Sequence, residues 1–288
     1  AKSSLKGELA MKKIQNIIGL LSLLFLLVAC TKSEENDVVK VGIRSSEIKT
    51  WEYIKEQAAK EQIHLELVTF SAQYDPNQAL AEGEVDINAF QHVAYLNLFN
   101  ENNGTDLQAI GTTIMAPIGL YSNKYKRIEE IKDGAKIAVP NDPSNWGRAL
   151  LLLQEYNLLT VTDNFDGNGG EDRIQDNPKN LTIVPVDGAT TPRVMGDTDF
   201  AIINNGVAVE AGLLLKDAII HENETAKPFI NVIVAKPEDK DNAKLKKIVE
   251  IYQRKETADF VSNISKGNYI PVNMPLDELA TWKTFYSY

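Results

Sequence analysis

The sequence has few of the residues on which enzymes and disulfide-bonded domains depend. Cys30 is its one cysteine, and it has three histidines among 288 residues. A single thiol excludes an internal disulfide, so the fold depends on its hydrophobic core. The chain has no two-histidine zinc spacing, no Gly-x-Ser-x-Gly, no phosphate loop and no dinucleotide motif. We therefore expect no catalytic residue, no metal and no cofactor.

The chain also lacks a hydrophobic run long enough to stay in a membrane as a helix. The apolar stretch Ile17–Ala29 has 13 residues and follows Lys12 and Lys13, whereas a spanning helix needs about 20. A charged start and a short apolar core predict a secretory signal peptide at 11–29, in preference to a buried core helix. The motif Leu27-Val28-Ala29-Cys30 resembles the bacterial lipobox, which predicts lipidation of Cys30 and explains the lone thiol.

Composition divides the rest of the chain. Residues 1–10 fit neither signal nor fold, and we treat them as an upstream extension or an artefact. Residues 30–37 are polar and predict a flexible tether. Residues 1–29 hold four lysines and one glutamate, so the net charge of −10 becomes −13 for the 259 residues that follow. That length favours two lobes, and an acidic surface argues against nucleic-acid binding.

Hydrophobic patterns after the tether alternate between strand and helix. Predicted strands cover 38–43, 63–70, 135–140 and 181–186, and predicted helices cover 50–62, 76–82 and 144–156. Trp51, Ile54 and Ala58 share one helix face, and Thr50 is a plausible cap. This order indicates an α/β protein with a largely parallel sheet. The similar segments 83–90 and 196–203 suggest that two such lobes repeat, although these turns are common.

Two positions are candidates for ligand contact. The segment from Pro140 to Arg148 links the end of a strand to a helix that Ser144 or Asn145 could cap. Amides of such a first turn attract anions, and Arg148 could add a bidentate grip on a carboxylate. An ordinary cap with a surface arginine is the alternative. His92 opens a helix directly after a strand, where it too could touch a ligand, whereas His64 is more typical of a structural position.

The acidic, glycine-rich segment 163–172 is reminiscent of a calcium loop. Twelve residues counted from Asp163 end at Ile174 rather than at a glutamate. We therefore expect a solvated loop without a metal.

Several longer motifs resemble the NlpA/MetQ lipoproteins, the substrate-binding proteins of methionine ABC importers, from about Val41 to Pro275. The motifs are Pro76-Asn77-x-Ala79-Leu80, Phe90-Gln91-His92-x-x-Tyr95-Leu96, Asp133-Gly134-Ala135-x-Ile137-Ala138-x-Pro140-Asn141-Asp142-Pro143-Ser144-Asn145, Arg148-Ala149-Leu150, Asn177-Pro178-Lys179-Asn180-Leu181 and Asn231-Val232-Ile233-Val234.

The resemblance implies a type II periplasmic-binding-protein fold, with two α/β lobes and a ligand cleft between them. Lobe 1 would comprise 38–121 and 229–288, lobe 2 would comprise 122–228, and hinges would lie near 120–122 and 228–232. It also implies a protein held by acylated Cys30 on the outer face of a bacterial membrane. Its partners would be the lipid bilayer and the permease and ATPase of an ABC transporter.

The resemblance further assigns a ligand site to seven residues. By analogy with the family, Asn145, Arg148, Asn204 and Asn231 would hold the amino-acid head group. Phe90, His92 and Tyr95 would surround the thioether. An apolar slot with a donor fork for a carboxylate suits such a zwitterion.

The ligand and the role stay open at this stage. L-methionine, D-methionine and a methionyl dipeptide all fit, and the chain departs from the family at Gln73, Tyr74, Trp146 and Val207. Another amino acid or a short peptide is an alternative ligand. A surface lipoprotein used in adhesion is an alternative role, and an exported enzyme is disfavoured by the missing catalytic motifs.

Overall fold

The computed structural model describes residues 37–223 and 226–286. The predicted signal peptide, the lipidation site Cys30 and all but the last residue of the tether lie outside the described residues. Among the residues described, no helix is long and apolar enough to cross a bilayer.

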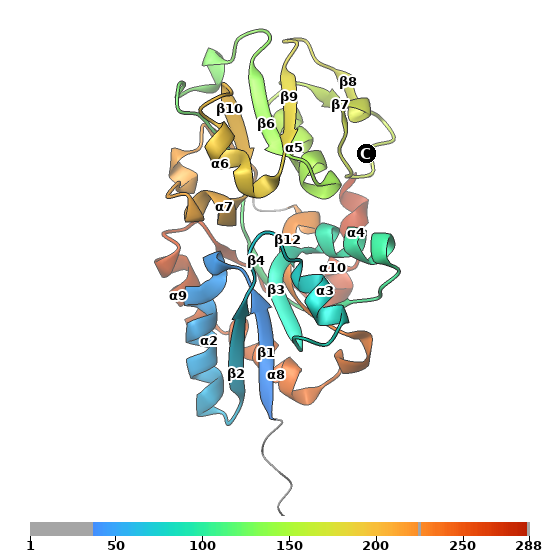
Figure 1. Ribbon diagram of the computed structural model, residues 1–288, viewed down its shortest axis with the longest axis vertical. Helices are drawn as coiled ribbons and strands as arrows, with labels where there is room; N and C mark the ends of the chain where they lie inside the picture. Colours follow the sequence, from blue (N-terminus) through green and yellow to red (C-terminus); the bar gives the residue numbers. More distant parts are fainter. Residues whose placement is uncertain (1–36, 224–225, 287–288) are drawn as a thin grey trace, which may run out of the picture. The chain divides into compact units, whose positions relative to one another are not determined.

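Strands and helices alternate along the described chain (Figure 1). The strands are β1 (Val38–Ile43), β2 (His64–Thr69), β3 (Ile87–His92), β4 (Gln108–Met115), β5 (Gly119–Tyr121), β6 (Lys136–Pro140), β7 (Thr160–Val161), β8 (Ile174–Asp176), β9 (Thr182–Val186), β10 (Phe200–Ile203), β11 (Ile220–His221), β12 (Ile230–Ala235) and β13 (Ile270–Pro271). The helices are α2 (Ile48–Lys60), α3 (Pro76–Ala81), α4 (Val93–Asn103), α5 (Pro143–Glu155), α6 (Thr191–Val194), α7 (Asn205–Glu210), α8 (Ala243–Tyr252), α9 (Lys255–Ile264) and α10 (Leu276–Leu279).

The strands form two main sheets and a small β7–β8 pair. The first sheet has the order β13-β4-β12-β3-β1-β2, and the second has the order β11-β5-β10-β6-β9. The predicted mixture of strands and helices is confirmed. The prediction of a largely parallel sheet is wrong, because β12 pairs antiparallel with β3 and β4, and β5 pairs antiparallel with β10. β12 and β5, the first strands after each crossing between the sheets, run opposite to both of their neighbours.

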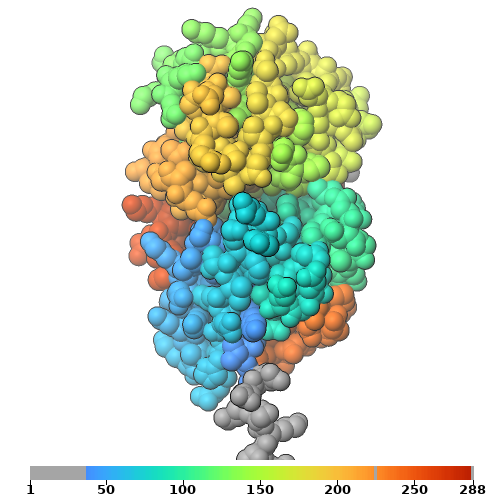
Figure 2. Space-filling view, viewed as in Figure 1, coloured from blue at the N-terminus to red at the C-terminus, as the bar shows by residue number. Residues whose placement is uncertain are grey.

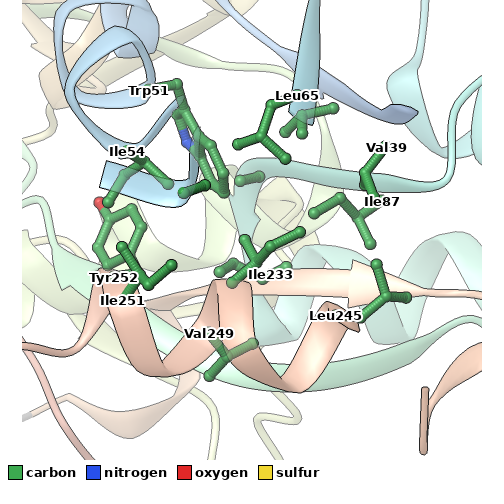
Figure 3. Packing of buried hydrophobic residues seen from close by; sticks show 14 of the residues in the cluster. Val39, Trp51, Ile54, Leu65, Ile87, Ile233, Leu245, Val249, Ile251 and Tyr252 are labelled. Atoms are coloured by element: carbon green, nitrogen blue, oxygen red, sulfur yellow. The ribbon is translucent and has the colours of Figure 1, made fainter. Parts of the chain in front are cut away.

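Helices cover both faces of the first sheet. In β12, Ile233 packs into the cluster that contains α2 and α8 (Figure 3). Its neighbours Val232 and Val234 belong to the cluster that contains α3 and α4 on the opposite face. Because β12 is covered on both faces, its residues from Val232 to Ala235 are all apolar and buried.

The second sheet repeats this arrangement. Ile137 and Val139 of β6 pack with α5, and Ala138 between them packs with the cluster that contains residues of α7. Each sheet therefore has its own core, and the strand ends that face a helix N-terminus become available for a site.

The start of α2 differs from the prediction. Thr50 is fully buried within the helix rather than capping it, and the helix begins at Ile48 after a 3₁₀ turn, Ser45–Glu47. Trp51, Ile54 and Ala58 are buried on one face, as predicted. The turn supplies the first backbone bonds, so no cap is needed at Thr50.

The chain passes from one sheet to the other between β4 and β5, and again between β11 and β12. The division into lobes at 38–121 with 229–288 and at 122–228 stays a prediction. Because β5 pairs with β10 in the second sheet, we propose moving its first boundary to residues 116–118, the connection before β5.

Candidate ligand-binding site

A cavity of about 370 Å³ is lined by residues of the first sheet and by residues of the loops and helices that follow strands of the second sheet. In Figure 2, cyan and yellow surfaces from segments far apart in the sequence meet on the visible face. All seven residues assigned by the resemblance line this cavity: Phe90, His92, Tyr95, Asn145, Arg148, Asn204 and Asn231. The fold therefore brings the predicted site residues together from β3, α4, α5, β12 and the loop that begins α7.

A larger cavity of about 730 Å³ adjoins α3 and α4. It includes four carboxylates, those of Asp75, Glu82, Glu84 and Asp142, and no cationic side chain. The 370 Å³ cavity also includes three carboxylates, those of Asp142, Asp187 and Glu210, but it adds two arginines and several asparagine amides. Of these two cavities, only the smaller one combines cationic groups with amide donors and acceptors, as a zwitterionic ligand requires. We therefore take it as the candidate site.

The N-terminus of α5 places two of these residues. Asp142 caps the helix, since its carboxylate accepts a bond from the Asn145 backbone amide at 3.0 Å, and Pro143 occupies the first turn. The predicted caps, Ser144 and Asn145, are wrong. A carboxylate cap is favoured here because it also accepts the Ser144 hydroxyl at 2.9 Å and complements the positive end of the helix. Arg148 follows one turn later.

Arg148 is buried, with 3% of its side chain exposed, and its charge is already balanced. Its Nε donates to Glu222 Oε2 at 3.0 Å, and its Nη2 donates to Glu222 Oε1 and to the carbonyl of Ala116 at 3.0 Å. The bidentate grip expected for a ligand is thus made with Glu222. Nη1 of Arg148 has no hydrogen-bond partner among the described residues, so it can donate to a ligand.

Glu222 is not among the site residues predicted from the sequence. It follows the two-residue strand β11 and also accepts the Ile118 backbone amide at 2.8 Å. Burial raises the pKa of Glu222, and the Arg148 cation opposes that rise. No sequence pattern indicates this pair, because the two residues are 74 positions apart and meet only after β11 pairs with β5.

Asn145 joins the two sheets through one amide oxygen. Its Oδ1 accepts bonds from His92 Nε2 at 2.8 Å and from Asn204 Nδ2 at 3.1 Å. Its Nδ2 donates to the Asp142 carboxylate at 3.0 and 3.2 Å. Both lone pairs of that oxygen are therefore occupied, so a ligand ammonium would need other acceptors in the cavity.

The protonation of His92 follows from its partners. Its Nδ1 accepts the Tyr95 backbone amide at 3.1 Å, so the ring proton is on Nε2, which donates to Asn145. Burial, reinforced by the Arg148 charge, lowers the pKa of His92 from 6.5 to about 3. The ring is neutral and acts as a fixed donor and helix cap.

Aromatic rings form a row between two arginines. The Arg148 guanidinium carbon lies 4.5 Å from the centroid of Phe229, and Phe229 lies 5.4 Å from His92. Tyr95 lies 6.3 Å from His92 and 5.9 Å from Phe90. Beyond Phe90, the guanidinium carbon of Arg44 lies 5.3 Å from the ring. Sequence reasoning missed Phe229 and Arg44 at the two ends.

The remaining asparagine, Asn231, lies in β12 directly opposite His92 in β3. It is half-buried and lines the cavity. Tyr95 contributes its ring from α4 while its hydroxyl donates to Asp75 Oδ2 at 3.0 Å. The hydroxyl is thereby fixed, and burial followed by the nearby carboxylate raises its pKa.

A carboxylate of the second sheet's helices reaches the first sheet at the cavity edge. Glu210 of α7 accepts the Ser45 hydroxyl and the Ser46 backbone amide, the latter at 3.1 Å. A negative charge at the start of the turn that leads into α2 is favourable. This contact joins the two walls of the cavity.

The segment 163–172 is a loop, as predicted, with half of its residues exposed, and it also packs against the rest of the chain. Phe165 is buried against Tyr286, and the Gly169 amide donates to the Pro143 carbonyl at 2.7 Å. A Cβ on Gly147 would lie 1.9 Å from the Gly167 carbonyl oxygen. Glycine at position 147 therefore lets this loop lie against the start of α5. Over residues 37–223 and 226–286, no group of acidic, histidine or cysteine side chains could hold a metal.

The neutral state of His92 predicts a pH dependence of stability. A histidine whose folded pKa is lower than its unfolded pKa of 6.5 binds a proton only in the unfolded chain. Between pH 6.5 and about 3, acidification therefore favours unfolding, by at most about 1.4 kcal/mol per pH unit. Urea denaturation at pH 7.5 and pH 5 should show a smaller decrease in the free energy of unfolding for His92→Gln than for the unsubstituted protein.

The comparison of His92→Gln with the unsubstituted protein isolates the contribution of His92 to the pH dependence of stability. Burial raises the pKa of Glu47 to about 7, so this carboxyl lowers stability as pH rises from 4.5 to about 7, and it does so equally in both proteins. His64 is exposed, so His64→Gln is the matched control and should leave the slope unchanged. Equal slopes for His92→Gln and His64→Gln would contradict a neutral His92.

Comparison with known proteins places this geometry in a family. A family model described as NlpA lipoprotein matches residues 39–273. The D-methionine-binding lipoprotein MetQ of Escherichia coli (strain K12) is 36% identical over 250 residues, which are 85% of this chain and 92% of that protein.

Solved structures give the same fold. A periplasmic substrate-binding protein of an ABC transporter from Coxiella burnetii is 38% identical, with a TM-score of 0.78 over 81% of this chain and 100% of that one. A nutrient binding protein from Burkholderia cenocepacia, solved with methionine bound, is also 38% identical, with a TM-score of 0.77 over 81% of this chain and 99% of that one. The predicted periplasmic-binding-protein fold is thereby confirmed, and the chain belongs to the NlpA lipoprotein family.

Proposed function

We propose that this protein is a lipid-anchored, extracytoplasmic binding protein that captures methionine or a close relative and delivers it to an ABC transporter permease. The observation that carries the proposal is the cavity in which all seven predicted residues, among them the buried Arg148, lie together. Similar proteins described as methionine-binding support the choice of ligand.

The cavity suits both ends of such a ligand. Nη1 of Arg148 offers a donor to a carboxylate, and the half-buried Asn231 offers an amide oxygen to an ammonium group. Phe90, Tyr95 and His92 supply aromatic surface, against which a thioether packs favourably. The protein would act by binding alone, without catalysis, as a transport protein.

Titration calorimetry tests the ligand. We expect saturable binding of at least one of L-methionine, D-methionine and a methionyl dipeptide, with no comparable response to alanine or lysine. Asn231→Ala should weaken binding about tenfold, because a hydrogen bond to a charged group contributes about 1.5–3 kcal/mol.

The control for this substitution is Asn263→Ala, since Asn263 lies in α9 and is exposed. It should bind as the unsubstituted protein does. If no methionine compound binds, the ligand assignment fails. If one binds equally well to Asn231→Ala, the head-group assignment fails.

The anchor is the second part of the proposal. It rests on the lipobox at Leu27–Cys30 and on the family's lipoproteins. Metabolic labelling with a fatty acid in bacterial cells should mark the unsubstituted protein and leave Cys30→Ser unmarked. Labelling of both would exclude Cys30 as the acylated residue.

A further inference from the structure

The cavity contains a second arginine, Arg44, which follows β1 directly. Its Nη1 donates to backbone carbonyls of the segment 70–74: Phe70 at 3.3 Å, Tyr74 at 2.9 Å, and Ser71. The residue thus fixes the loop that closes one side of the cavity. The same guanidinium lies over the face of Phe90.

Arg44 keeps donors for a ligand. Within the described part of the chain, its recorded hydrogen bonds all leave from Nη1. The Nε and Nη2 groups therefore retain three N–H donors. No ion pair with a described carboxylate is recorded for Arg44, in contrast to Arg148 with Glu222.

Arg148 and Arg44 each lie over one terminal ring of the aromatic row, in which Phe90, His92 and Tyr95 line the cavity and Phe229 does not. The row runs from Arg148 over Phe229, His92, Tyr95 and Phe90 to Arg44. An amino acid whose carboxylate meets Arg148 and whose side chain packs on His92, Tyr95 and Phe90 therefore directs the end of that side chain toward Arg44, which lies over Phe90.

Charges around Arg44 decide what that end can be. Asp75 and Glu210 are close enough to act on its charge, so the immediate surroundings of this one cation contain two carboxylates. A further full negative charge on the ligand would be repelled. A neutral oxygen acceptor can accept hydrogen bonds from the N–H groups of Arg44 without that repulsion. A hydrocarbon side chain would leave these N–H groups without a partner.

We propose that Arg44 is a specificity-determining residue that contacts the end of the ligand's side chain and favours a neutral hydrogen-bond acceptor there over hydrocarbon. This inference rests on the proposed amino-acid binding function and adds the residue that selects among such ligands.

Titration calorimetry with three ligands of similar shape tests this inference. The ligands are L-norleucine, with a methylene at the sulfur position, L-methionine, and L-methionine sulfoxide, which carries an oxygen acceptor. We expect the unsubstituted protein to prefer the sulfoxide to norleucine and Arg44→Met to reduce that preference at least about tenfold, the size of one charged hydrogen bond.

Further variants separate specificity from folding. Arg44→Lys keeps the charge but lacks the planar guanidinium that could bind the loop and a ligand at once. Its preference for the sulfoxide over norleucine should therefore lie between those of the unsubstituted protein and Arg44→Met. Arg127→Met is the control, because the Arg127 side chain is 75% exposed and does not line the cavity; it should leave all three affinities unchanged. L-Glutamate should bind no better than norleucine.

The outcomes distinguish the two proposals. If Arg44→Met lowers all three affinities by one factor, Arg44 only supports the cavity wall and the inference is wrong. Preference for norleucine or glutamate by the unsubstituted protein also overturns it. If the unsubstituted protein binds none of the three ligands or any other amino acid, it is the proposed function that fails.

Discussion

Replacement of Glu222 by alanine is expected to lower the free energy of unfolding by about 3–5 kcal/mol. The side chains of Arg148 and Glu222 are 3% and 7% exposed, so removal of the carboxylate leaves a buried guanidinium without its counter-ion. The Ile118 amide loses its acceptor as well. This penalty arises mainly from the charge that stays behind, rather than from the strength of the pair itself.

Urea denaturation followed by circular dichroism measures this change. Glu278→Ala is the matched control: Glu278 pairs with Lys227 at 3.6 Å on the surface, with 52% and 31% of the side chains exposed, and exposed pairs contribute at most about 1 kcal/mol. The double replacement Arg148→Met with Glu222→Leu should recover most of the lost stability. A loss below that of Glu278→Ala would contradict a buried charge pair.

Replacement of Trp51 by alanine should also cost about 3–5 kcal/mol. The indole is fully buried between α2 and the first sheet, with its ring centroid 5.6 Å from that of Tyr252 (Figure 3). Truncation removes this contact and leaves a cavity that the surrounding strands cannot close. The effect should appear as a lower midpoint in thermal denaturation.

Trp51→Phe distinguishes packing from hydrogen bonding. The indole Nε1 has no hydrogen-bond partner among the described residues, so phenylalanine loses volume but no bond and should be much less destabilising than alanine. Val38→Ala is the surface control, because Val38 is 46% exposed. Equal losses for Trp51→Phe and Trp51→Ala would show that the indole nitrogen matters after all.

Local sequence patterns predicted the elements but not the contacts between them. Trp51, Ile54 and Ala58 recur at helical spacing, and this period alone identifies the buried face of α2. The cap of α5 was misassigned because Asp142, Ser144 and Asn145 are all good capping residues. Which one binds the first-turn amides depends on the backbone direction after β6, which a sequence does not specify.

Of the charged residues of the site, some could be predicted from local sequence and others could not. Arg148 was predicted because a strand end, two prolines and a helix start stand together in the sequence. Glu222 and Arg44 could not be found, because their positions depend on long-range strand pairing, of β11 with β5 and of β1 with β3. The motif resemblance assigned the seven cavity residues, and the partners that balance their charges came only from the structure.

Arg148 also contacts both connections between the sheets, through the Ala116 carbonyl in one and through Glu222 and Phe229 in the other. A rotation of one sheet relative to the other would have to act through these two connections, so Arg148 would lie near the pivot of such a rotation. Atoms near a pivot move little, and displacements increase with distance from it. Phe90 and Arg44 would therefore move more than Arg148. A ligand held in the proposed orientation would have its carboxylate near this pivot and its side chain farther from it. A small difference in side-chain length would then correspond to a difference in the angle between the two sheets.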